Sequence, residues 1–169
     1  MRDVSQPLLF ETSWEVANKV GGIYTVLKTK VPVTVQEYGD RYHLTGPWNR
    51  LSAHVEVEEI EPESPAIAAA VAAIRDQGIQ VLYGRWLIDG APRVILFDIG
   101  SAAYKLDEWK GDIWQVSGIP SPPNDTETND AIILGYLNAW LFEEVRTSER
   151  QGGGAGTCGG PACAYELHA

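Results

Sequence analysis

The chain opens with a strand, a glycine-containing loop and a helix in close succession. Residues 8–14 are mostly apolar and suit a short strand. The loop after them ends at Gly21–Gly22, and apolar residues then recur at helical spacing through residues 23–30. Pro32 is expected to end this helix soon afterwards. A strand, a loop and a helix are the first half of a βαβ unit, so the segment predicts parallel strand pairing with a right-handed crossover.

Strands and helices continue to alternate along the rest of the chain. Further strands are expected at residues 42–45, 54–60, 79–84 and 93–99, and further helices at 66–77, 101–116 and 126–147. Asp89–Gly90 is a turn signal between two of these strands and predicts a hairpin at residues 79–99. This alternation indicates an α/β fold in which helices pack on a sheet that is parallel where a helix intervenes.

Charge and composition restrict the partners of the chain. Its net charge is −10, and a surface of this sign repels the phosphate backbone of nucleic acid, so no nucleic-acid partner is expected. The longest apolar stretch, residues 131–142, is well short of the roughly 20 residues that a membrane helix needs, and no secretory signal precedes the first strand. Cys158 and Cys163 lack the spacing and the histidines of a zinc site. We therefore expect a cytoplasmic protein with no membrane partner, no metal and no cofactor.

Lys19, Gly21 and Gly22 are the candidate binding residues, because they lie between the first strand and the first helix. The N-terminus of a helix presents unpaired N–H groups and a partial positive charge. Two glycines let a phosphate approach the backbone and a lysine adds a mobile positive charge, so the three residues suit a diphosphate. The pattern is neither a P-loop nor a dinucleotide fingerprint. Two glycines before a helix also occur as plain turn geometry, and Lys19 also fits a solvated surface charge.

Several longer blocks of the sequence resemble one family. Residues 10–27, which contain the run WEVANKVGGIYTVL, are similar to the N-terminal signature of animal and fungal glycogen synthases. The similarity continues, in the correct order, through YGRWLIDGAP at residues 83–92, EWKGD at 108–112, GIPSP at 118–122 and TNDA at 128–131. The resemblance covers roughly residues 8–149, and it is strongest for the fungal members.

The resemblance implies a fold and an activity. Members of this family have two Rossmann-like domains that face a cleft, so the chain is expected to be an incomplete Rossmann-like N-terminal domain of a GT-B glycosyltransferase. They transfer glucose from UDP-glucose to the non-reducing end of an α-1,4-glucan, with retention at the anomeric carbon and without a required metal. By resemblance, Lys19, Gly21 and Gly22 bind UDP-glucose and glycogen is the acceptor. A glycogenin-type primer protein and a homo-oligomeric full-length enzyme are also implied.

The chain departs from the family pattern after residue 150. We expect residues 1–150 to form a partial domain and residues 151–169 to be a Gly-rich, disordered tail, because residues 151–161 offer nothing to bury. We also expect the second domain and its catalytic groups to lie outside these 169 residues, so no catalytic residue is assigned and the chain alone is expected to be inactive. The alternative is a non-catalytic interaction fragment whose helices at 101–117 and 126–147 bind a primer protein or a synthase subunit.

The other polar positions have structural interpretations. Arg85 is expected to pair with one of the many acidic side chains. His43 and His54 are single histidines in predicted strands, which favours structural roles over catalysis or metal binding. Glu108 and Asp112 share a helix face, but nothing in the sequence suggests a closed pocket around them, so a solvated charged face is expected.

Overall fold

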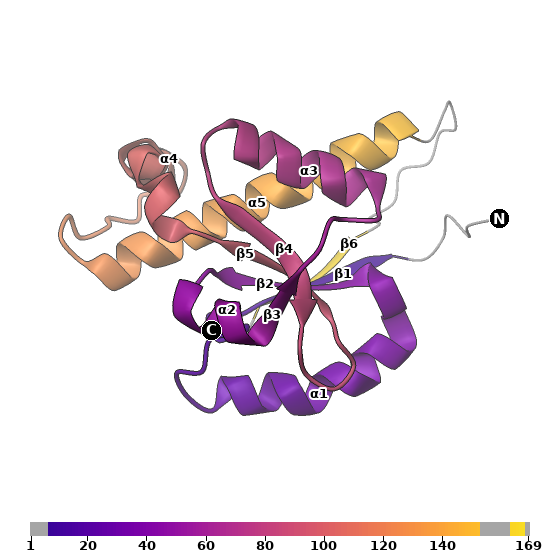
Figure 1. Cartoon of the computed structure of the whole chain (residues 1–169). Helices are drawn as coiled ribbons and strands as arrows, with labels where there is room; N and C mark the ends of the chain where they lie inside the picture. Colours follow the sequence, from indigo (N-terminus) through magenta and orange to yellow (C-terminus); the bar gives the residue numbers. More distant parts are fainter. Residues whose placement is uncertain (1–6, 153–162, 168–169) are drawn as a thin grey trace. The chain divides into compact units, whose positions relative to one another are not determined.

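The computed structural model describes residues 7–152 and 163–167. Strands and helices alternate along the chain, as Figure 1 shows. The chain divides into two compact units, which are described separately. Within the described residues, the first unit contains 7–62, 82–96 and 163–167, and the second contains 63–81 and 97–152.

The described strands form one mixed sheet. Their bounds are β1 Leu8–Thr12, β2 Tyr42–Pro47, β3 Val57–Glu59, β4 Val81–Trp86, β5 Arg93–Phe97 and β6 Cys163–Leu167. The strand order is β3-β4-β5-β2-β1-β6. β1 pairs in parallel with β2, with Leu9 opposite Tyr42, and β3 pairs antiparallel with β4, with Val57 opposite Trp86. The loop from β4 to β5 turns at Gly90, whose φ is 88°, as the turn signal predicts. The α/β class is confirmed, and the architecture is that of an incomplete Rossmann-like domain.

The helix α1, Ile23–Tyr38, packs against one face of this sheet (Figure 1). Its buried residues Leu27 and Val31 belong to an apolar core that also contains Leu44 of β2 and Trp86 of β4. Burial of apolar surface contributes roughly 25 cal/mol per Å², so this face supplies much of the stability of the first unit. The predicted strand–loop–helix start of the chain is confirmed.

The prediction that Pro32 ends the first helix is wrong, because α1 continues to Tyr38. A proline inside a helix removes one N–H donor and costs roughly 3 kcal/mol. Beyond it, Thr34 is buried, and Val35 and Tyr38 pack against the apolar core. Their burial outweighs the local cost of the proline, so tertiary packing extends the helix.

Residues 54–60, predicted as one strand, divide between a helix and a strand. The helix α2, Arg50–Glu56, begins after Asn49, whose side chain accepts hydrogen bonds from the N–H groups of Leu51 and Ser52. The strand β3 follows at residue 57. The prediction is therefore wrong for residues 54–56, because the cap at Asn49 starts a helix that alternation within 54–60 does not reveal.

Part of the tail forms a strand. β6 pairs in parallel with β1, and Leu9 lies opposite Ala164 in this register. Without β6, this edge of β1 would leave its backbone N–H and C=O groups without strand partners. The strand departs from the disorder expected for residues 151–169. Residues 153–162 and 168–169 lie outside the described residues, so the boundary between domain and tail stays a prediction.

The second unit is mainly helical. It contains α3 (Pro65–Asp76), the 3₁₀ segment Ile99–Lys105, α4 (Leu106–Ser117) and α5 (Thr126–Gly152). α3 and α5 lie side by side, and α4 also contacts α5 (Figure 1). The Asp125 carboxylate caps α5 by accepting from the N–H groups of Glu127 and Thr128. The predicted helices are confirmed, although the first turns of 101–116 are 3₁₀. No helix among the described residues combines the length and apolar character that crossing a bilayer demands.

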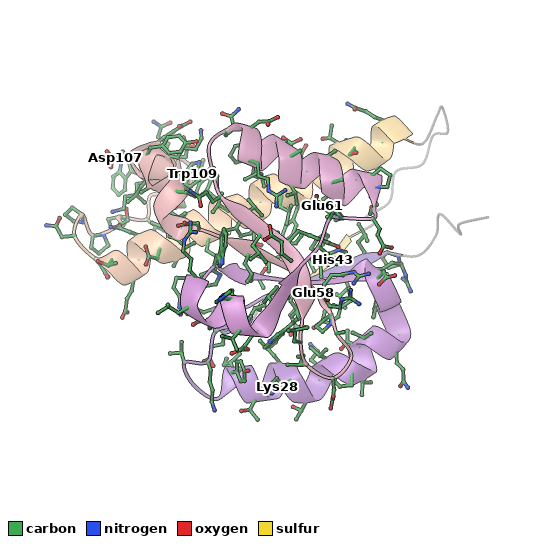
Figure 2. All side chains as sticks on the ribbon, viewed as in Figure 1. Lys28, His43, Glu58, Glu61, Asp107 and Trp109 are labelled. Carbon is green, nitrogen blue, oxygen red and sulfur yellow. The ribbon has the colours of Figure 1, made fainter. Side chains whose placement is uncertain are left out.

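His43, labelled in Figure 2, gives the fold a pH-dependent stability. It is 1% exposed, its ring centroid lies 5.5 Å from that of Phe10, and its Nε2 lies 3.3 Å from Tyr83 Oη. Burial lowers the pKa of His43 from 6.5 to about 4. Between these values the unfolded chain binds a proton that the folded chain does not. The free energy of unfolding should therefore be unaffected by His43 above pH 6.5 and fall by roughly 3 kcal/mol as the pH drops toward 4.

Urea unfolding at a series of pH values measures this dependence. His43→Leu is expected to remove the loss of stability in that pH window, whereas His54→Leu is expected to leave it, because His54 is exposed. The same loss in His43→Leu as in the unchanged chain would show that another group is responsible.

Candidate functional site

The loop 13–22 begins at the carboxyl end of the parallel strands β1 and β2. The Ser13 N–H donates to the Thr45 carbonyl at 3.0 Å, so the first residue of the loop continues the strand pairing. Gly46 allows this approach, because a Cβ there would lie 2.6 Å from the Ser13 carbonyl oxygen. Ligands of open α/β sheets bind beyond the carboxyl ends of the strands. The loop therefore lies at the edge of the sheet where a ligand site is expected.

Side-chain contacts hold the loop in place. Asn18 Nδ2 donates to the Trp14 carbonyl at 3.1 Å, and Asn49 Nδ2 donates to Asn18 Oδ1 at 3.0 Å. Ala17 is buried and has a φ of 48°, in the left-handed region that residues other than glycine rarely adopt. A strained backbone of this kind persists only where the surrounding contacts hold it. The loop is thus tied to the start of α2 through Asn49.

Glu15 places a carboxylate at the N-terminus of α1. Its Oε2 accepts from the Gly21 N–H at 2.8 Å and from the Tyr24 N–H at 2.9 Å. Burial opposes ionisation, but hydrogen bonds from the Tyr24, Gly21, Val20 and Ile23 backbones hold the pKa of Glu15 below its usual range. A Cβ on Gly21 would lie 3.1 Å from Glu15 Oε1, so the glycine leaves room for the carboxylate. The sequence hypothesis treats the Gly21 N–H as open to a phosphate, whereas the structure gives it a protein acceptor.

Gly22 and Lys19 are the open members of the candidate set. Both residues are exposed, and a Cβ on Gly22 would meet no heavy atom within 4 Å. The Gly22 carbonyl accepts from Thr25 and Val26 at 3.1 and 3.2 Å, which starts α1. Among residues 7–152 and 163–167, no group accepts from the Gly22 N–H. A ligand can therefore occupy the space beside the Gly22 Cα without meeting a side chain.

Tyr24 connects the loop with the sheet. Lys19 Nζ lies 6.0 Å from the centroid of its ring, and the Nζ of Lys28, labelled in Figure 2, lies 5.4 Å from it. The Tyr24 hydroxyl donates to Glu56 Oε2 at 2.8 Å, and Trp86 Nε1 donates to the same oxygen at 3.0 Å. Burial and the Glu56 carboxylate raise the pKa of Tyr24 to about 12, so the hydroxyl remains a donor at neutral pH. Tyr24 thus fixes the surface beside which Lys19 lies.

The structure brings Lys19, Gly21 and Gly22 together on one loop, as their closeness in sequence requires. Sequence reasoning missed Glu15 and Tyr24. The signal for Glu15 is hydrogen-bond accounting: the first N–H groups of a helix need acceptors, and Gly22, the residue at the N-cap of α1, has no side chain to supply one. Glu15 is an acidic residue close enough in sequence to do so. Tyr24 has no comparable signal.

Two features near α2 and β4 do not belong to this site. Arg85 Nε lies 3.2 Å from Glu58 Oε2, its cross-strand neighbour, so the structural interpretation of Arg85 is confirmed. A pocket of about 340 Å³ has Trp48, His54 and Leu82 in its lining. No residue of the loop 13–22 lines this pocket, so it contributes nothing to the geometry around Lys19.

Comparison with known proteins decides the family. The glycogen synthase family model matches residues 11–155, which include the whole loop. The chain belongs to the glycogen synthase family. The glycogen [starch] synthase of Neurospora crassa is 58% identical over 150 residues, 89% of this chain and 21% of that protein. The glycogen [starch] synthase isoform 2 of Saccharomyces cerevisiae is 49% identical over 158 residues, 89% of this chain and 22% of that protein. The human liver protein is 49% identical over 142 residues, 84% of this chain and 20% of that protein.

The resemblance noted in the sequence is therefore confirmed for fungal and animal glycogen synthases. The chain spans about a fifth of the length of the curated relatives it matches. The family match extends a few residues beyond 150 and includes each candidate residue, Glu15 and Tyr24. The alternative of a non-catalytic interaction fragment is not favoured by these comparisons.

Proposed function

We propose that this chain is the N-terminal part of a glycogen synthase that transfers glucose from UDP-glucose to the non-reducing end of an α-1,4-glucan, with retention at the anomeric carbon. The observation that carries the proposal is the family match across residues 11–155, which contains the loop at the carboxyl edge of the sheet. Further catalytic groups would come from the parts of the relatives that this chain does not span, since it covers 21% of the Neurospora crassa protein. No residue here is assigned to bond breaking.

The loop geometry suits the leaving group of this reaction. UDP departs as an anion, and positive groups held in place beforehand lower the barrier to its departure. Lys19 supplies an exposed cation, and the exposed Gly22 supplies an N–H that no described residue accepts, with open space where its Cβ would stand. Gly21 has no side chain to block a ligand that binds Lys19 and Gly22. Its own N–H donates to Glu15 Oε2 at 2.8 Å. In this proposal the three residues contact UDP-glucose, with Lys19 and Gly22 on the diphosphate.

The proposal also includes the acceptor, the protein partners and the location of the enzyme. Glycogen is the proposed acceptor, and the names of the relatives, glycogen [starch] synthases, support this choice. A glycogenin-type primer protein, a homo-oligomeric full-length enzyme and a cytoplasmic location follow from the resemblance alone.

Glucose incorporation from labelled UDP-glucose into glycogen tests the proposed activity. The 169-residue chain is expected to transfer no detectable glucose, because the chain spans about a fifth of its relatives. A graft that carries residues 11–155 in place of the matching segment of the Neurospora crassa protein is expected to be active. A folded but inactive graft would contradict the proposed function. Robust transfer by the chain alone would show that the other segments are not required.

A further inference from the structure

Glu15 occupies the position that an anionic ligand takes at many helix N-termini. The Gly21 and Tyr24 N–H groups, which point at the Glu15 carboxylate from 2.8 and 2.9 Å, are the donors that a phosphate-binding loop offers to its ligand. The Glu15 residue is only 9% exposed, so the carboxylate is part of the folded loop. A diphosphate that reaches this point must either displace the carboxylate or bind beside it.

Displacement is the more costly course. A hydrogen bond to a charged group contributes roughly 1.5–3 kcal/mol, and Glu15 accepts one from Gly21 of the loop and one from Tyr24 of α1 at short distances. The backbone around Glu15 is also held, by the burial of Ala17 and by the contacts of Asn18 with Trp14 and Asn49. Binding beside the carboxylate keeps these contacts and uses the N–H of the exposed Gly22 together with Lys19.

We propose that Glu15 is a positioning residue of the donor site. Its carboxylate stays on the Gly21 and Tyr24 N–H groups while UDP-glucose binds, and it thereby orients the Gly22 N–H and Lys19 toward the diphosphate. Its negative charge also offsets the positive end of the α1 dipole, so the diphosphate is directed to Lys19 and away from the helix axis. This inference rests on the proposed function, because it takes UDP-glucose as the ligand of the loop.

Tyr24 extends this effect to Lys19. Glu15 holds the Tyr24 N–H at 2.9 Å and Glu56 holds its hydroxyl at 2.8 Å, so both ends of the residue are fixed. Lys19 Nζ lies 6.0 Å from the ring centroid. A cation beside an exposed aromatic face gains roughly 0.5–1 kcal/mol, enough to bias where a mobile lysine lies. Loss of the Glu15 charge would weaken the hydrogen bond that holds one end of Tyr24 and with it the preference of Lys19 for its position.

Titration of the ¹⁵N-labelled 169-residue chain with UDP-glucose, followed by NMR, tests the proposal. The Gly22 N–H signal should shift in the unchanged chain. Glu15→Gln keeps the size of the side chain and removes its charge, and the dissociation constant for UDP-glucose should rise about tenfold. Glu15→Asp restores the charge and should recover part of that affinity, which a loss of packing alone would not explain. Glu37→Gln, an exposed position on the same helix, is the matched control and should bind like the unchanged chain.

The outcomes separate this inference from the proposed function. An unchanged or lower dissociation constant in Glu15→Gln overturns the inference, and a lower one identifies the carboxylate as a competitor of the donor. If Glu15→Gln does not fold, the test uses Glu15→Asp, whose shorter side chain places the carboxylate farther from the Gly21 and Tyr24 N–H groups. Binding of UDP-glucose by Glu15→Asp as tight as in the unchanged chain then overturns the positioning role. No response of any loop signal in the unchanged chain overturns the donor site itself, and with it both proposals.

Discussion

Glucose transfer is expected to fall by about 100-fold when Lys19 is replaced by alanine. The substitution is made in the graft that carries residues 11–155 of this chain in the Neurospora crassa protein, where the other catalytic groups are present. Lys19 is exposed on the loop at the carboxyl end of β1, and its ammonium is the mobile cation of the proposed diphosphate site. Its loss would leave the departing UDP with less positive charge in the transition state than in the unchanged graft. The measurement is kcat/KM for UDP-glucose at saturating glycogen.

Lys28→Ala is the matched control for this experiment. Lys28 Nζ lies 5.4 Å from the ring centroid of Tyr24, close to the 6.0 Å of Lys19 Nζ, but Lys28 belongs to the surface of α1. A general effect of positive charge near Tyr24 would lower activity in both variants. The proposed role of Lys19 requires a large loss for Lys19→Ala and a change within about threefold for Lys28→Ala. Near-normal transfer by Lys19→Ala would contradict the assignment.

The start of the fold is predictable because its determinants are local. Apolar spacing and Gly21–Gly22 identify β1, the loop and the beginning of α1. Pro32 and Asn49 mark where local rules fail. At Pro32, burial of residues beyond the proline outweighs its cost, and at Asn49 a side-chain cap starts a helix that alternation within 54–60 does not reveal. Both failures come from interactions with residues outside the short segment in which the spacing of apolar residues is read.

The candidate site is predictable as a set of residues but not as an arrangement. Lys19, Gly21 and Gly22 share one exposed loop because they are near neighbours in sequence. The hydrogen bond from the Gly21 N–H to Glu15 joins residues six positions apart through a side chain that turns back on the backbone. No hydrophobic pattern reports such a contact, and only an accounting of the first N–H groups of α1 points to an acceptor such as Glu15. β6 depends in the same way on pairing with β1, which a Gly-rich composition conceals.

Gly46→Ala is expected to lower the free energy of unfolding by about 3 kcal/mol. A Cβ at residue 46 would lie 2.6 Å from the Ser13 carbonyl oxygen and 3.2 Å from Val16 Cβ, atoms that cannot swing aside as a long side chain can. The loop would have to move away from β2, and the Ser13–Thr45 hydrogen bond would weaken with it. Urea unfolding followed by tryptophan fluorescence measures the loss.

Gly22→Ala separates this packing requirement from ligand binding. A Cβ on Gly22 meets no heavy atom within 4 Å, so the free energy of unfolding of Gly22→Ala should stay within about 1 kcal/mol of that of the unchanged chain. The same methyl group would fill the open space beside the Gly22 Cα, which the proposed donor site leaves to UDP-glucose, so the NMR response to UDP-glucose should weaken. In Gly46→Ala the free energy of unfolding and the NMR response to UDP-glucose should both decline, because the displaced loop carries Lys19 and Gly22 with it. Unchanged stability in Gly46→Ala would contradict the close approach of the loop to β2 on which the proposed donor site depends.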